Sequence, residues 1–445
     1  MRIDLPSPKK FHHIFEQTLG KSLSKKVSGI TTDSRDVHEN DLYIAISGEN
    51  VDGHSFLPEV YKKGACAALV NKANHSLELE QLEVENTIKS IGTVANCWRN
   101  QFHIPIIGIT GSNGKTSTKE LLKHILSSKY DVHATEGNYN TSIGLPLTIL
   151  KLSEYHGASI LEMGANQPGD IELLCKIADP NYGLITNIAP AHLEGFGNID
   201  NIAKTKGALF EHLSDGTSFV NIADHRIKNI KASGKIVTYG LTSNCDYPAD
   251  LHHNDEGSIV LTIDSEEVET KSVNLSFAKN VLACSAIACE LDINWEAIKE
   301  RIMTFKAPKG RCEIKSNGKV TIIDDTYNAN IESTLAAIDY LKAFSGNENK
   351  IFIFGDMLEL GDHSEKQHRK IGEKCNEAKL YAVLTIGNET IATNDEINQS
   401  TIHKHFDDKN DLISYFNEIC NENDKILVKG SRGMHMEEIV NSILG

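Results

Sequence analysis

The chain has 445 residues, of which 40% are hydrophobic and 24% are charged, and its formal net charge is −16. This length predicts about three domains, each able to bury its own core, and the composition is that of an ordinary soluble globular protein. The excess of negative charge argues against nucleic-acid binding and against attraction to an anionic membrane surface. Any anionic ligand must therefore be bound by local hydrogen-bond donors.

The nine cysteines include no C-x-x-C pair and are odd in number, which favours a reducing compartment over a disulfide framework. The first ten residues lack the apolar segment of a signal peptide. No apolar run approaches the ~18 residues that a membrane span requires. We therefore expect a cytoplasmic protein without membrane insertion.

Residues 1–83 are expected to form a first, small α/β unit, because short apolar strands at 41–48 and 66–70 flank a predicted helix at 57–63. The following acidic and then helical stretch, residues 79–95, is expected to be a linker and a lead-in helix. Several residues near the strand ends are candidates for an anion-binding or sugar-binding pocket, although each taken singly is more typical of a solvated turn: Ser34, Arg35, Gly48 and His54.

The most informative stretch is residues 106–117, IIGITGSNGKTS, in which an apolar strand runs into a glycine-rich turn and then into a predicted helix. This is the arrangement of a P-loop, whose backbone N–H groups and helix dipole cradle phosphate. An ordinary turn with a surface lysine is the less favoured alternative. The spacing is a variant, because Ile109 stands where the first glycine is usual. The expected phosphate-binding residues are Gly111, Ser112, Asn113, Gly114, Lys115, Thr116 and Ser117, with Lys115 neutralising phosphate charge and the Thr116 hydroxyl holding Mg²⁺.

Residues 84–308 alternate strands and helices, which predicts a parallel sheet around the P-loop. The strand at 158–164 carries Glu162, and His192 follows the strand at 182–189. Carboxyl ends of parallel strands meet at one edge, so both side chains are expected near the P-loop, where Glu162 can bind Mg²⁺. A purely structural role for Glu162 is about as plausible, and the case for His192 depends on its position. The polar residues 240–272 are expected to be irregular with strand pieces.

Lys206 falls on the apolar stripe of a predicted helix at 199–213. Two interpretations stay open. In the first, the lysine stem lies along apolar surface with its ammonium in water. Alternatively, a desolvated amine has a lowered pKa and can add CO₂, giving a carbamate whose oxygens can bind Mg²⁺.

From about residue 309 the strand–helix alternation restarts, which predicts a third, Rossmann-like domain over 309–445 with a final helix at 434–444. Asp324 and Asp325 end its first strand and face opposite sides, so they are not expected to be an acid–base pair. One of them at a strand end can bind a ribose hydroxyl or orient a lysine; a solvated turn is equally plausible.

Short motifs in all three predicted domains occur together in one known family. They lie at residues 32–35 (TDSR), 53–56 (GHSF), 108–116 (GITGSNGKT), 137–140 (GNYN), 162–166 (EMGAN), 191–197 (AHLEGFG), 204–210 (KTKGALF), 310–311 (GR), 324–330 (DDTYNAN), 355–361 (GDMLELG) and 428–432 (VKGSR). The combination resembles the Mur ligases, the ATP-dependent enzymes that form amide bonds in peptidoglycan synthesis. HLEGFG and DDTYNAN point to the branch that joins D-alanyl-D-alanine to UDP-N-acetylmuramoyl-tripeptide.

The resemblance implies a UDP-sugar-binding domain (1–83), a P-loop ATPase domain (84–308) and a C-terminal ligase domain (309–445), with ATP and two Mg²⁺ as cofactors and an acyl-phosphate intermediate. The protein is expected to be a monomer. By resemblance, Lys115, Glu162, His192 and Lys206 are catalytic; Thr116 and Glu162 hold one Mg²⁺, and His192 and carbamylated Lys206 help to hold the second. Ser34, Arg35, Gly48, His54, Asn138, Asn140 and Thr141 bind substrate, and Asn280, Arg311, Asp325 and Asn328 reach ATP.

Two positions depart from the family pattern. Ser276-Phe277 stand where His-Asn is usual ahead of Asn280, which bears on the adenine contact, and Ile331 stands where proline is common. Alternative functions are another Mur-type or folylpolyglutamate-type ligase, a P-loop kinase or NTPase, and a catalytically silent UDP-sugar-binding or interaction module. The residues that precede the P-loop disfavour the folylpolyglutamate type, and the C-terminal third is not needed by a kinase.

Overall fold

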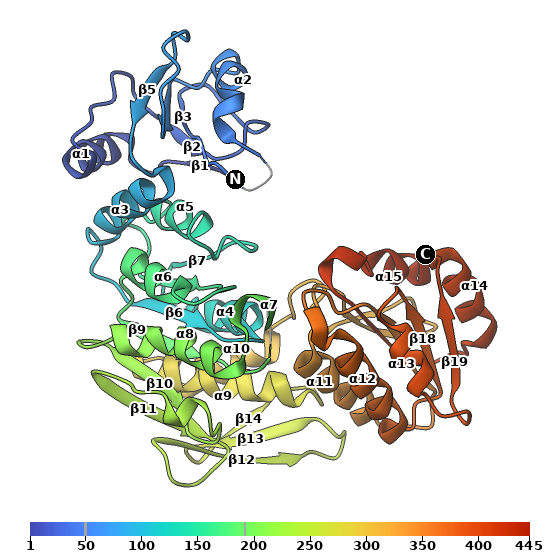
Figure 1. Ribbon diagram of the computed structural model, residues 1–445. Helices are drawn as coiled ribbons and strands as arrows, with labels where there is room; N and C mark the ends of the chain where they lie inside the picture. The colour runs from blue at the N-terminus through green and yellow to red at the C-terminus, as the bar shows by residue number, and fades with distance from the viewer. Residues whose placement is uncertain (49–50, 191–192) are drawn as a thin grey trace.

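The computed structural model describes residues 1–48, 51–190 and 193–445, and it contains three β-sheets with flanking helices (Figure 1). The expected three-part α/β architecture is therefore confirmed. The N-terminal sheet lies at one end of the molecule, and the C-terminal sheet lies to one side of the central one. Within the described parts of the chain, no helix is long and apolar enough to cross a membrane.

The N-terminal sheet has five strands in sequence order, and all neighbours are parallel except the antiparallel first pair. The expected linker is wrong in its first part, because residues 80–83 pair with the preceding strand and extend this sheet. The strands are β1 (Arg2–Asp4), β2 (Gly29–Thr31), β3 (Asp41–Ile44), β4 (Ala67–Val70) and β5 (Glu80–Glu83), with helices α1 (Pro8–Leu19) and α2 (Leu57–Lys62).

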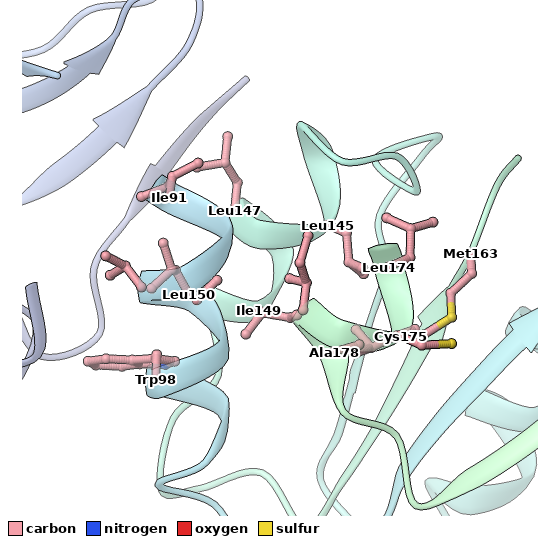
Figure 2. Close-up of a cluster of buried hydrophobic side chains, with 14 of the residues drawn as sticks. Ile91, Trp98, Leu145, Leu147, Ile149, Leu150, Met163, Leu174, Cys175 and Ala178 are labelled. Carbon is pink, nitrogen blue, oxygen red and sulfur yellow. The ribbon is translucent and has the colours of Figure 1, made fainter. Parts of the chain in front are cut away.

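Helix α3 (Thr87–Arg99) joins the first sheet to the central part through a continuous apolar core. It begins where the Asn86 side chain accepts a hydrogen bond from the Lys89 N–H. Its buried face packs on α1, on α5 (Gly144–Leu150) and on α6 (Asp170–Ala178). Figure 2 shows Ile91 and Trp98 of α3 beside Leu147 and Leu150 of α5. The Trp98 indole donates to the Leu152 carbonyl at 3.1 Å.

The central sheet has nine strands in the order β14-β13-β12-β11-β10-β9-β6-β8-β7. Residues 240–272 are more regular than expected, because three antiparallel strands at 247–253, 259–263 and 266–269 extend the sheet here. Buried side chains such as Leu261 and Ile263 alternate along the middle one of these strands. The strands are β6 (Ile106–Thr110), β7 (Val132–Ala134), β8 (Ala158–Glu162), β9 (Tyr182–Ile185), β10 (Thr217–Asn221), β11 (Lys235–Gly240), β12 (Tyr247–His253), β13 (Ile259–Ile263) and β14 (Glu266–Glu269). The remaining helices of this part are α4 (Lys115–Leu126), α7 (Leu193–Phe196), α8 (Ile199–His212), α9 (Leu275–Glu290) and α10 (Trp295–Thr304).

The C-terminal sheet has six strands in the order β15-β16-β20-β17-β18-β19, parallel except for the edge strand β15. The last helix begins at Glu437, later than expected, because residues 432–434 form a 3₁₀ turn. The strands are β15 (Glu313–Ser316), β16 (Thr321–Asp325), β17 (Lys350–Gly355), β18 (Ala382–Ile386), β19 (Ile402–Phe406) and β20 (Lys425–Lys429). The helices are α11 (Ile331–Ala343), α12 (Ser364–Ala378), α13 (Ile391–Glu396), α14 (Lys409–Ile419) and α15 (Glu437–Leu444).

Candidate active site

The glycine-rich loop connects β6 to the first turn of α4, as its sequence predicts. Gly111 has φ of +146°, and a Cβ there would lie 1.9 Å from the Thr186 hydroxyl. Gly114 has φ of +80° and immediately precedes the helix. Only glycine fits at Gly111, because both the backbone conformation and the close approach of Thr186 exclude a side chain. The helix N-terminus then directs its free N–H groups and its dipole toward the space in front of the loop.

Residues that follow β9 hold this loop in place. The Asn187 side-chain oxygen accepts from the Asn113 N–H at 2.9 Å, and the Thr186 hydroxyl donates to the Asn113 carbonyl at 2.6 Å. The Ser112 hydroxyl donates to the Ala189 carbonyl at 2.8 Å. Thr186 and Asn187 were not predicted as site residues; their position after a central strand was the available signal.

Lys115 folds back over the loop, and its ammonium donates to the Gly111 carbonyl at 2.8 Å. Burial lowers the pKa of Lys115, while the nearby Glu162 carboxylate opposes this shift. A phosphate bound at the loop can replace the Gly111 carbonyl as the hydrogen-bond acceptor of this ammonium. The contact thus keeps the positive charge next to the expected phosphate site.

Glu162 ends β8, directly beside the P-loop strand, because Ile109 of β6 pairs with Glu162 in parallel register. Its side chain is 2% exposed. One carboxylate oxygen accepts from the Thr116 hydroxyl at 2.9 Å, and the other accepts from the Asn140 amide at 2.8 Å. A buried carboxylate next to a hydroxyl is a set of hard oxygen donors, so these residues fit Mg²⁺, which typically takes one or two carboxylates plus phosphate oxygens.

Lys206 lies on α8 and is 3% exposed. Burial, and next the Lys115 charge, lower the pKa of Lys206 well below its ordinary value, while Asp170 opposes the shift. Its ammonium lies 6.0 Å from the centre of the Phe196 ring. The desolvated interpretation is therefore favoured over the solvent-exposed one. His192 lies outside the described residues.

The C-terminal domain contributes the opposite wall through residues at the end of β16. Asp325 forms an ion pair with Lys429 at 2.5 Å and accepts from the Cys312 N–H at 3.1 Å. Asp324 points the other way, toward Lys315 at 2.6 Å, as the strand alternation predicts. The Arg311 guanidinium stacks on the Tyr327 ring, 3.8 Å from its centre. Lys429 is a site residue that the sequence did not single out, although a lysine partner for one aspartate was foreseen.

A cleft of about 1180 Å³ separates the two walls. The walls touch where the Asn330 amide, at the N-terminus of α11, donates to the Asn113 side-chain oxygen at 2.6 Å. This contact joins the C-terminal domain to the P-loop itself. The predicted residues that line the cleft are Ser112, Asn113, Gly114, Lys115, Thr116, Ser117, Asn140, Glu162, Asn280, Arg311, Asp325 and Asn328; Gly111, Lys206, Asn138 and Thr141 are not among its lining residues.

The start of α9 forms another part of the cleft lining. Asn274 caps this helix by accepting from the Ser276 and Phe277 N–H groups. The Phe277 ring stacks on Phe305 with 5.8 Å between centroids and 8° between planes. Asn280 lies beside the P-loop, 3.5 Å from where a Cβ on Gly114 would be. The departure at Phe277 therefore places a flat apolar surface where the family pattern has an amide.

The predicted sugar-binding residues lie apart from this cleft, at the carboxyl edge of the N-terminal sheet. Arg35 is exposed and pairs with Asp33 at 2.7 Å, which lowers the pKa of that carboxyl. Both ring nitrogens of His54 are used within the protein: Nδ1 contacts Asp52 at 2.7 Å and Nε2 accepts from the Asn71 N–H at 2.9 Å. His54 thus holds the loops after β3 and β4 together. Ser34 and Gly48 lie in the loops after β2 and β3.

Comparison with known proteins agrees with this geometry. Three family models match the chain: "Mur ligase family, catalytic domain" over residues 26–96, "Mur ligase middle domain" over 109–288, and "Mur ligase, glutamate ligase domain" over 310–432. Two relatives named UDP-N-acetylmuramoyl-tripeptide–D-alanyl-D-alanine ligase are similar over most of their length. The Haemophilus influenzae protein is 34% identical over 94% of each chain, and the Bacillus subtilis protein is 33% identical over 97% of this chain and 94% of its own.

Solved structures show the same similarity in three dimensions. MurF from Acinetobacter baumannii superposes with a TM-score of 0.89 at 29% identity, covering 97% of this chain and 98% of that one. MurF from Thermotoga maritima in complex with ADP superposes with a TM-score of 0.84 at 28% identity, covering 93% and 96%. Together with the P-loop, the acidic strand end and the facing C-terminal wall, these matches show that the chain belongs to the Mur ligase family.

Proposed function

We propose that the protein is an ATP-dependent ligase that joins D-alanyl-D-alanine to UDP-N-acetylmuramoyl-tripeptide, giving the pentapeptide, ADP and phosphate. One observation carries the proposal: a P-loop with Glu162 and Asn140 faces Arg311 and Asp325 of another domain across a single cleft. A simple kinase or NTPase does not require the second wall. The ligase activity also agrees with the names of the relatives reported above.

The chemistry follows from the poor reactivity of a carboxylate toward amines. The γ-phosphoryl group of ATP is transferred to the terminal carboxylate of the tripeptide, giving an acyl phosphate. The amine of the dipeptide then attacks the acyl carbon, and phosphate leaves. Lys115 and the loop N–H groups offset the negative charges that meet during the transfer, so the protein acts mainly through positioning and electrostatics.

Thr116 and Glu162 are the residues that would hold Mg²⁺ next to the phosphates, and His192 with Lys206 would help to hold a second ion. When bound, Mg²⁺ supplies charge neutralisation between the phosphate oxygens and the incoming carboxylate. Glu162 is already oriented for this by the Thr116 hydroxyl and the Asn140 amide at 2.9 and 2.8 Å.

We further propose that Lys206 acts as its carbamate. Its 3% exposure and lowered pKa favour the neutral amine, whose lone pair can add to the carbon of CO₂ with loss of one proton. The test is ¹³C NMR of the protein under ¹³CO₂, which should show a carbamate signal that is absent from Lys206→Ala. Rescue of Lys206→Ala by acetate supports the role, and full activity of that variant without acetate refutes it.

The UDP end of the substrate is assigned to the N-terminal sheet, around Ser34, Arg35 and Gly48, with His54 holding the loops. Its peptide end is assigned to Asn138, Asn140 and Thr141 beside Glu162. The proposed oligomeric state is a monomer. The domain limits proposed for these roles are 1–83, 84–308 and 309–445, and the proposed location is the cytoplasm.

The contact to the adenine of ATP is assigned to Asn280 and the Phe277 ring. On the other wall of the cleft, the residues assigned to ATP are Arg311, Asp325 and Asn328. The deciding assay uses purified protein with ATP, Mg²⁺, UDP-N-acetylmuramoyl-tripeptide and D-alanyl-D-alanine. We expect phosphate release that requires both UDP-N-acetylmuramoyl-tripeptide and D-alanyl-D-alanine, together with UDP-N-acetylmuramoyl-pentapeptide detected by mass spectrometry. Phosphate release that is independent of the dipeptide would refute the ligase assignment.

A further inference from the structure

Lys119 is a buried lysine for which the chemistry above has no use. It lies on α4, one helical turn after Lys115, and is 1% exposed. Its ammonium donates to the Thr135 carbonyl and pairs with Glu120 at 2.6 Å. Burying an ammonium is costly unless it is paired and hydrogen-bonded, and these two contacts offset that cost.

The Thr135 contact links Lys119 to the candidate metal ligand. Thr135 directly follows β7 and is 1% exposed. Its hydroxyl accepts from the Glu162 N–H at 3.0 Å, and its own N–H donates to the Ile160 carbonyl at 3.0 Å. Thr135 is therefore fixed to the last residues of β8 on one side and to the P-loop helix on the other.

The same segment continues into the loop that carries Asn140. The Asn140 amide contacts one Glu162 oxygen, and the Asn140 carbonyl accepts from the Gly164 N–H at 2.8 Å. The Thr116 hydroxyl on α4 contacts the other Glu162 oxygen. The two contacts to the carboxylate thus come from α4 and from the loop after β7. The hydrogen bond from Lys119 to Thr135 joins these same two elements.

We propose that Lys119 is a positioning residue. It fixes the position of α4 relative to the loop between β7 and α5, and so aligns Glu162 with Thr116 for binding Mg²⁺. The inference rests on the proposed function of this site. Without the ammonium, the Thr135 carbonyl loses its partner in a dry environment and the loop shifts to find another one. Outer contacts of this kind typically contribute ~10- to 100-fold in metal affinity.

The test measures metal binding directly. Mn²⁺ replaces Mg²⁺, and its dissociation constant is determined by electron paramagnetic resonance in the presence of ADP. Lys119→Met keeps the length of the stem and removes the charge, and we expect it to weaken Mn²⁺ binding by about 10-fold or more. Lys119→Arg keeps a donor and should recover part of that loss. The KM for metal-bound ATP should rise more than kcat falls.

Lys151→Met is the matched control. Lys151 pairs with Glu136 at 2.6 Å on the outer side of the same loop and does not contact Thr135 or Glu162. It should leave Mn²⁺ affinity within about twofold of the wild type. Lys119→Gln is a second variant in case Lys119→Met does not fold, because its shorter side chain carries no charge while keeping a polar group, and it should also weaken Mn²⁺ binding.

Wild-type Mn²⁺ affinity in a folded Lys119→Met, or in Lys119→Gln if the former does not fold, overturns the inference. An equal loss in Lys151→Met also overturns it. Mn²⁺ binding does not depend on which acceptor is used. Failure of dipeptide-dependent phosphate release in the wild type would therefore refute the proposed function without deciding the role of Lys119.

Discussion

His133 makes the stability of the central sheet depend on pH. It lies on β7 and is 6% exposed, and its ring contacts the Thr148 carbonyl at 3.0 Å and the Ser159 hydroxyl at 2.9 Å. A carbonyl can only accept, so Nε2 carries the proton and Nδ1 accepts from Ser159. Burial, and next the neighbouring His156, lower the pKa of His133 from 6.5 to about 3.

The sign follows from this lowered value. As the pH falls below 6.5 the unfolded chain binds a proton that the folded protein refuses until about pH 3, so stability is lost over that window. At about 1.36 kcal/mol per pH unit, the loss between pH 6.5 and 5 is about 2 kcal/mol. Well above pH 6.5, His133 is neutral in both the folded and the unfolded protein, so it causes no loss of stability there.

The assay is urea unfolding at pH 7 and pH 5, followed by the fluorescence of Trp98, whose indole is buried in the adjoining core. A Trp295→Phe background removes the only other tryptophan. His133→Gln should be less stable at both pH values but should lose about 2 kcal/mol less than the parent on acidification. Equal losses in the two proteins would show that His133 is not held neutral.

Three further outcomes test the site. Gly111→Ala should abolish ADP binding in calorimetry while far-UV circular dichroism stays unchanged, because a Cβ would lie 1.9 Å from the Thr186 hydroxyl; retained binding would contradict the strained turn. Lys429→Met should lower the free energy of unfolding by about 3–5 kcal/mol by leaving Asp325 unpaired, and adding Asp325→Asn should restore part of it; additive losses would argue against the pair. Phe277→Ala should weaken ADP binding by about 1 kcal/mol and leave inorganic triphosphate binding unchanged, whereas equal effects on both ligands would remove Phe277 from the base site.

Much of the central site was predictable because its determinants are local. A strand, a glycine turn and a helix start are contiguous at residues 106–117, and the carboxylate at Glu162 ends a plainly apolar strand. The alternation of Asp324 and Asp325 likewise follows from strand geometry alone, and the two side chains do point to different partners.

Other features depend on contacts between distant segments and left little trace in the sequence. The Asn330–Asn113 bond and the Asp325–Lys429 pair join residues far apart in the chain. Lys119 looks like a charged residue on a helix surface until β7 covers it. The strands at 247–269 were underestimated because their charged residues obscure the alternation of the buried ones.

The core around α3 has a consequence for substrate length. The apolar cluster is continuous from the first sheet into the central one, whereas the C-terminal part meets the P-loop through a polar contact across a cleft. On the proposed assignment of the UDP end to the first sheet, the distance from that sheet to Glu162 is set by this shared core. On that assignment, a precursor one residue too short would place its carboxylate away from the γ-phosphate.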